Sequence, residues 1–187
     1  MSNERALRES ILQVASIAEV CIHQKALLPA LILIYSGIDT MGWLVADDES
    51  AAVVDRFASW VDKYMLGTKS LDCTSLDLYA ARCGILHTFT ADSRLSATGK
   101  ARPIYYVWGK VSAEDHARVA GATREKCVFL RVEDLSEAFR RGVAKTVEVA
   151  TTDGALSDRM LSKAGKFFLS IPTNELLGRP DTQPGAP

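Results

Sequence analysis

Residues 26–46, which read ALLPALILIYSGIDTMGWLVA, decide the fold. The run is apolar on nearly every side of a helix, and Pro29 lies within its first turn, where proline is tolerated. It is long enough to span a bilayer, but it contains Gly37, Gly42 and Asp39, and an aspartate at a bilayer centre costs about 3 kcal/mol. We therefore predict a buried core helix with the rest of the chain packed around it, and no membrane partner.

Amphipathic helices are predicted on both sides of this core helix, because apolar residues recur at spacings of three and four. Asp47 and Asp48 are placed to cap the helix after them, and Thr74 with Asp77 resembles a capping box before another helix. The expected ranges of the amphipathic helices are 3–24, 49–65, 75–89, 133–149 and 155–169.

A small β insert is predicted in the C-terminal half. Residues 91–103 are polar and basic, and we expect a surface loop there. The β-branched and aromatic runs at 104–108 and 127–132 predict a two-stranded ribbon around a short helix, 113–120. The fold class is therefore mainly α: an antiparallel helical bundle with a small β insert. We expect a single domain, 1–172, made of a four-helix part (1–90), the insert (91–132) and C-terminal helices (133–172), followed by a disordered tail (173–187).

Charge and cysteine content exclude several classes of protein. The 187 residues include 22 Lys and Arg against 23 Asp and Glu, so no global field attracts nucleic acid, and an RNA site would have to be local. The four cysteines form no C-x-x-C pair, which argues against a zinc or redox centre, and we expect no cofactor. The first ten residues lack the apolar run of a signal peptide, so a cytoplasmic location is expected.

Reactive side chains gather in the predicted helix 75–89, where Tyr79 to His87 read YAARCGILH. On an ideal helix Arg82 and His87 lie about 140° apart around the axis and roughly 7.5 Å apart along it. We therefore do not expect one helix to bring both side chains to one small group. A second copy of the helix across a twofold axis would place both pairs around one cleft.

This stretch resembles the motif of the HEPN superfamily, all-helical proteins whose ribonuclease members carry Arg, four to six residues, then His. Here four residues separate Arg82 from His87, and the resemblance covers roughly residues 5–90. It implies a metal-independent endoribonuclease of the toxin or defence type, acting as a homodimer with a composite Arg/His site and opposed by a neutralising protein partner. In it His87 would move a proton and Arg82 would stabilise the charged phosphate. Family ribonucleases usually have a polar residue directly after the arginine, where this chain has Cys83.

Other roles for the same residues stay open. Arg82 can simply pair with Asp39 or Asp77, and His87 can end the helix by bonding its last carbonyls. Cys83 and His87 share a helix face, which also permits a thiolate–imidazole pair or two metal ligands. Asp39 and Cys83 are therefore candidates for a supporting role. A catalytically silent helical module that binds RNA, nucleotide or a partner protein is the alternative function.

The loop after the motif carries Arg94, Lys100 and Arg102. These side chains are candidates for holding RNA phosphates beside His87, because phosphate contacts position a substrate without reading its sequence. A solvated basic loop is the alternative.

Overall fold

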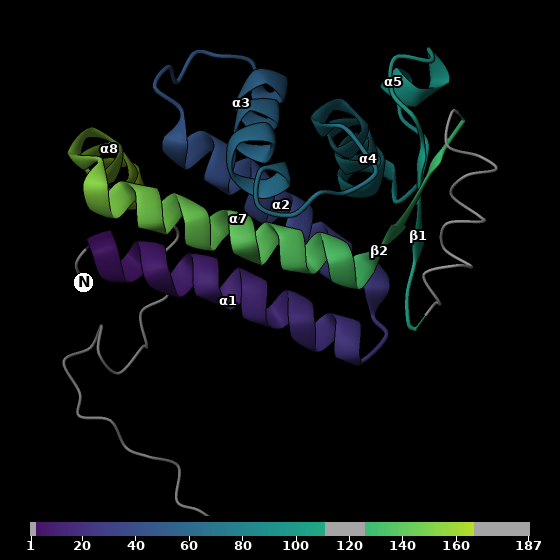
Figure 1. Ribbon diagram of the computed structural model, residues 1–187, viewed down its shortest axis with the longest axis horizontal. Coiled ribbons are helices and arrows are strands. Elements are labelled where there is room, and N and C mark those ends of the chain that lie inside the picture. The colour runs from purple at the N-terminus through teal and green to yellow at the C-terminus, as the bar shows by residue number, and fades with distance from the viewer. Residues whose placement is uncertain (1–2, 111–125, 167–187) are drawn as a thin grey trace, which may run out of the picture.

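The computed structural model describes residues 3–110 and 126–166 of the chain, and the part that it describes is mainly helical with a small sheet (Figure 1). This confirms the predicted mainly α class and the small β insert. The predicted short helix 113–120 and the tail 173–187 lie outside the described residues. The elements are α1 (Asn3–His23), α2 (Leu27–Val45), α3 (Val53–Trp60), the π-helix η1 (Val61–Leu66), α4 (Ser75–Thr88), α5 (Arg94–Ala97), β1 (Ile104–Val107), β2 (Val128–Arg131), α7 (Val132–Thr152) and α8 (Gly154–Ala164).

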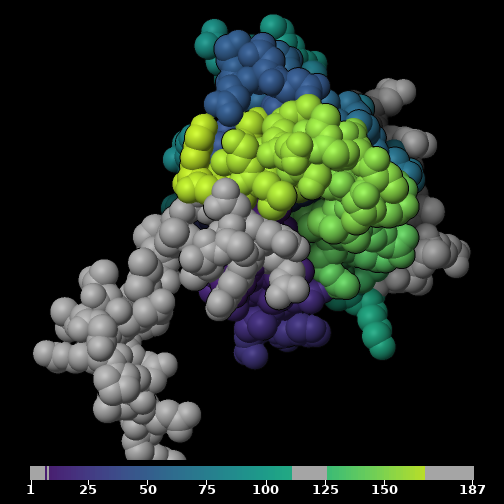
Figure 2. All heavy atoms as spheres, turned by 90° about the vertical axis from the view of Figure 1, so that its left-hand side faces the viewer, coloured from purple at the N-terminus to yellow at the C-terminus, as the bar shows by residue number. Residues whose placement is uncertain are grey.

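Helix α2 is the core helix that the sequence predicts. It contacts α1, α3, α4, α7 and α8, and Ile34, Tyr35, Ile38 and Leu44 are fully buried. By length and composition alone α2 could cross a membrane, but half of its apolar window is buried inside this fold. Helices α1 and α7 run side by side along one face of the molecule (Figure 1). Figure 2 shows α7 and α8 (green to yellow) between α1 (purple) and the chain around residue 50 (blue).

Two glycines let α7 approach the core closely. A Cβ at Gly142 would lie 2.9 Å from the Trp60 ring, and one at Gly37 of α2 would lie 2.5 Å from the Phe139 ring. The approach brings Trp60 Nε1 within 2.9 Å of Thr146 Oγ1, to which it donates a hydrogen bond. Because both residues are fully buried, this bond satisfies a donor that water cannot reach.

The prediction of a helix at 49–65 is wrong about the residue at which the helix begins and in taking it to be of one type along its whole length. Helix α3 begins at Val53, and its N-cap, Ala52, makes no side-chain bond. Asp48 instead accepts hydrogen bonds from the backbone N and Oγ of Ser50, a local turn that competes with capping, and Asp47 pairs with Arg159. From Val61 the helix widens into η1, which ends at Leu66.

The predicted ribbon is present as two parallel strands. Ile104 is opposite Val128 and Val107 is opposite Arg131, and β2 runs directly into α7. Residues 108–127 separate the two strands in the chain, and 111–125 of these lie outside the described residues. The loop before β1 contains α5, which has its own capping box formed by Ser93 and Ser96.

Candidate active site

The start of α4 is fixed by the capping box that the sequence predicts. Thr74 Oγ1 accepts a hydrogen bond from Asp77 N at 3.1 Å, and Asp77 Oδ2 accepts one from Thr74 N at 3.0 Å. From this start α4 packs on α2 and α3 and buries its Leu78, Ala81 and Ile85 face. Arg82, Cys83 and His87 therefore lie on the more open side of the helix.

Arg82 is held by Asp39 from α2. The Arg82 Nε donates to Asp39 Oδ2 at 2.8 Å, and Arg82 Nη2 lies 2.6 Å from the same oxygen. The Tyr79 ring lies 5.8 Å from the guanidinium carbon and adds a cation–π contact. The guanidinium is thus oriented by a carboxylate and an aromatic ring, and it is still 16% exposed.

The third nitrogen of Arg82 reaches the histidine. Arg82 Nη1 lies 3.3 Å from His87 Nε2 within one chain. The sequence-based expectation that one helix does not bring these side chains together is therefore wrong. It compared only positions on the helix surface, whereas the long arginine side chain bends along the helix and covers the separation. The ionic contact with Asp39 leaves Nη1 directed at the exposed imidazole.

Asp39 itself is only partly satisfied. Its Oδ2 takes both bonds from Arg82, while its Oδ1 is buried and accepts no hydrogen bond from the described residues. Burial raises the pKa of Asp39 above its ordinary value, although the hydrogen bond and charge of Arg82 act in the opposite direction. Asp39 is therefore a positioning group for Arg82 and makes no direct contact with His87.

Cys83 contacts the cluster through Arg82 and Tyr79. Its sulfur lies 4.0 Å from Arg82 Nη1, at the limit of a weak hydrogen bond. No contact between Cys83 and His87 supports a thiolate–imidazole pair. Within residues 3–110 and 126–166, no group of three or more His, Cys, Asp or Glu side chains is arranged to hold a metal ion.

The three basic residues of the loop separate into two groups. Arg94 on α5 and Lys100 are exposed, as a phosphate-binding role requires. Arg102 instead donates from Nη2 to the buried Asp77 Oδ2 at 2.7 Å and to Asp72 O at 3.3 Å. We therefore remove Arg102 from the phosphate-binding set, because its guanidinium fastens the loop to the start of α4.

Sequence reasoning did not assign two aromatic residues at this site. Tyr79 lies three residues before Arg82, and on a helix that spacing places both side chains on one face, which is a signal that could have been used. Phe89 follows the helix end and is 64% exposed. Its local backbone has no signature in the sequence, since it is a left-handed turn at a residue other than glycine.

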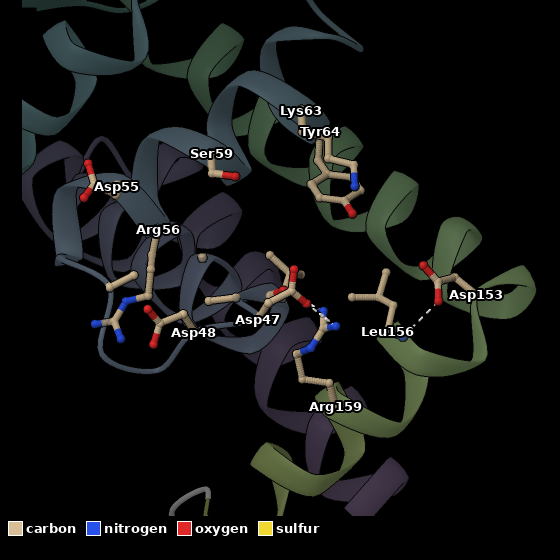
Figure 3. Close-up of a pocket in the computed structure, with 14 residues that line it drawn as sticks. Asp47, Asp48, Asp55, Arg56, Ser59, Lys63, Tyr64, Asp153, Leu156 and Arg159 are labelled. Carbon is tan, nitrogen blue, oxygen red and sulfur yellow. Dashed lines mark hydrogen bonds and ion pairs between the residues drawn. The ribbon is translucent and has the colours of Figure 1, made fainter.

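A separate cavity of about 420 Å³ lies between the end of α2, α3, η1 and α8 (Figure 3). It shares no residue with the Arg82 cluster. Its charged groups are largely engaged: Asp47 pairs with Arg159, and Asp153 Oδ1 accepts from Leu156 N at 3.0 Å. Arg56 lines this cavity, and its positive charge also acts to lower the pKa of Asp39 in the Arg82 cluster.

The site combines an arginine held by a carboxylate with an exposed histidine. These two groups are suited to binding and cleaving a phosphodiester. A guanidinium binds phosphate oxygens through forked N–H donors, and an imidazole accepts or gives a proton near neutral pH. A scan against protein-family models and searches of curated proteins and of solved structures found no match for this chain.

Proposed function

We propose that this protein is a metal-independent endoribonuclease of the HEPN type. The observation that carries the proposal is the approach of Arg82 Nη1 to His87 Nε2, at 3.3 Å, with the guanidinium held by Asp39. The motif that resembles the HEPN ribonucleases adds support.

In the proposed reaction His87 acts as the base. Bound phosphate takes the Arg82 Nη1 donor away from His87 Nε2, which frees that nitrogen. The neutral imidazole then takes the proton from a ribose 2′-hydroxyl at Nε2, and the 2′-oxygen attacks the adjacent phosphorus. The bond from phosphorus to the 5′-oxygen breaks, and that oxygen takes up a proton. The products are a 2′,3′-cyclic phosphate and a 5′-hydroxyl end.

Arg82 would stabilise the charge that develops on the phosphate. A guanidinium has five N–H donors, and two of its nitrogens are directed at Asp39 Oδ2. Nη1 and the remaining proton on Nη2 can then bind the non-bridging oxygens. Such preoriented donors stabilise a transition state more than flexible ones, because they need no reorganisation during the reaction.

The proposal includes a homodimer. One histidine can take the 2′-proton, but the leaving 5′-oxygen also needs a proton donor, and His87 of a second copy would supply it. The dimer thus supplies a second proton-transfer group, and it is not needed to bring Arg82 and His87 together. Sedimentation at micromolar concentration tests whether the protein forms a dimer. A strictly monomeric active enzyme would contradict the role given to His87 of a second copy.

The test of the proposed function is cleavage of single-stranded RNA by purified protein in the presence of EDTA. We expect Arg82→Ala and His87→Ala to lower the rate by at least about 10²-fold. We expect Asp39→Asn to lower it less, because Arg82 remains but is less well oriented.

Matched controls separate this effect from general damage. His23→Ala removes another exposed histidine, and Arg141→Ala removes an exposed arginine on α7. Both should cleave like the wild type. If Arg82→Ala and His87→Ala fold normally and also cleave like the wild type, the proposed site is wrong. If the wild type binds RNA and never cleaves it, the silent binding module is the correct function.

A further inference from the structure

Phe89, directly after α4, combines two unfavourable features. It caps the helix in the left-handed region, with φ 57° and ψ 32°, where glycine is the usual residue. Its side chain is 64% exposed, more than any other large hydrophobic side chain in the described part of the chain. A residue with a side chain is unfavourable in this backbone conformation, and the exposed ring gains little from burial in the core. Such backbone outliers tend to occur at functional sites.

The segment around Phe89 is held firmly in this conformation. The backbone N–H groups of Phe89 and Thr90 both donate to Gly84 O, and Thr88 Oγ1 donates to the same oxygen at 3.0 Å. Thr90 Oγ1 donates to Asp92 O at 3.0 Å. A Cβ at Gly84 would lie only 2.8 Å from Asp92 O, so the absence of a side chain there lets the segment fold back on α4.

This fold-back keeps the backbone of Phe89 at the C-terminal end of α4, close to His87. Phe89 is two residues from His87, so their Cα atoms are at most about 7 Å apart. A side chain at this position can reach the nucleotide next to one whose phosphate is bound by Arg82. Because the segment is already ordered, a ligand that stacks on the ring does not have to pay for ordering it.

We propose that Phe89 is a stacking platform for an unpaired nucleobase next to the phosphate held by Arg82. This rests on the proposed function for its location. Every base has a π-face, so the platform would select unpaired RNA over duplex without reading sequence. It makes single-stranded loops and ends the substrate class of the site.

Binding measurements test this without any need for cleavage. The probe is a short single-stranded RNA with 2′-O-methyl groups, which cannot be cut through the 2′-oxygen. Phe89→Gly should weaken its binding by about fivefold or more, the range found when a stacking aromatic residue is removed. Phe89→Tyr should bind like the wild type, because it keeps the ring.

The thermal stability of Phe89→Gly shows whether this variant is folded. Phe89→Gly relieves the left-handed backbone, so its melting temperature should be equal to or higher than that of the wild type. Lys25→Gly is the matched control: Lys25 is the other non-glycine residue with positive φ in the described chain, at 58°, and it lies between α1 and α2. It should gain stability in the same way and bind RNA unchanged.

A probe with one abasic position completes a double-mutant cycle. At the stacking position, removal of the base should weaken binding to the wild type and not to Phe89→Gly, because each change removes the same contact. Equal binding by the wild type and Phe89→Gly would overturn the inference and leave RNA cleavage by the wild type standing. Weakened binding in a protein that never cleaves would support the platform and refute the proposed reaction.

Two further outcomes would also overturn the inference. The first is a wild type that does not bind the probe at all. The second is a Phe89→Gly variant that loses a dimer in sedimentation and binds RNA unchanged, which would assign the ring to a protein contact.

Discussion

The buried carboxylate of Asp77 joins the start of α4 to Arg102, 25 residues later in the chain. Asp77 Oδ1 accepts from the Arg102 backbone N at 2.7 Å, and Asp77 Oδ2 accepts from Arg102 Nη2 at 2.7 Å and from Nε at 3.2 Å. Thr74 N donates to the same carboxylate. One side chain therefore both begins the helix that carries Arg82 and anchors the loop that carries Arg94 and Lys100.

Removing the arginine from this pair should strongly destabilise the fold. Asp77 is only 4% exposed, and Arg102→Met would leave its charge buried without a cation, which typically costs about 3–5 kcal/mol. The free energy of unfolding in urea measures this cost. Arg94→Met, on the exposed α5, is the control and should change stability by less than about 0.5 kcal/mol. Equal unfolding midpoints for the two variants would contradict the structural role of Arg102.

The same pair predicts a pH dependence of stability. Burial raises the pKa of Asp77, but hydrogen bonds from Thr74 and Arg102 outweigh it and hold the pKa below its ordinary value. A depressed folded-state pKa contributes stability above the unfolded pKa of about 3.9, and that contribution is lost as pH falls through the folded pKa. The stability difference between the wild type and Asp77→Asn should be largest near neutral pH and should shrink below about pH 4. A difference that is constant from pH 7 to pH 3 would argue against an ionised Asp77.

The hydrogen bond between α7 and the Trp60 indole should contribute measurably to stability. In Thr146→Val the buried Nε1–H of Trp60 loses its acceptor, and an unsatisfied buried donor costs about 1–3 kcal/mol. Thr152→Val, at the exposed end of the same helix, is the matched control. Denaturant titrations of both variants give the comparison. A Thr146→Val protein as stable as Thr152→Val would mean that Trp60 finds another partner.

Arg94 and Lys100, the two exposed basic residues of the loop, should contribute to the salt dependence of RNA binding. If Arg94 and Lys100 contact phosphates, replacing both by Ala should lower the slope of log K against log salt by about 0.7 for each contact on single-stranded RNA. Replacing Lys145 and Lys166, which are remote in sequence and lie on α7 and after α8, should leave the slope unchanged. Filter binding at several salt concentrations provides the slopes. Identical slopes for the wild type and the Arg94 and Lys100 double variant would show that this loop only faces solvent.

Local patterns in the sequence predict the helices and the cap of α4 well. The apolar run of α2, the periodicity of α1 and the box formed by Thr74 and Asp77 each involve residues within a few positions of one another. The predicted start of α3 is too early, because Asp48 has a competing partner in Ser50 that the pattern does not rank. The widening into η1 has no counterpart in the apolar periodicity.

The candidate site could be predicted in composition but not in geometry. Arg82, His87 and Asp39 were identified by residue type, and the pairing of Arg82 with Asp39 was one of the options. Whether Arg82 contacts His87 depends on the length and conformation of the arginine side chain. The positions of the two residues on the helix do not reveal this. The bond from Arg102 to Asp77 joins two segments that only the folded chain brings together, so a basic loop in the sequence could not reveal it.

The central claim is that Arg82 and His87 cleave RNA through the 2′-hydroxyl without a metal ion. The most direct measurement is the chemistry of the product ends after incubation of the purified protein with a single-stranded RNA in EDTA. The account predicts fragments that end in a 2′,3′-cyclic phosphate and begin with a 5′-hydroxyl, and no cut at a position that carries a 2′-deoxyribose. Fragments with a 3′-hydroxyl, or an activity that EDTA abolishes, would contradict it.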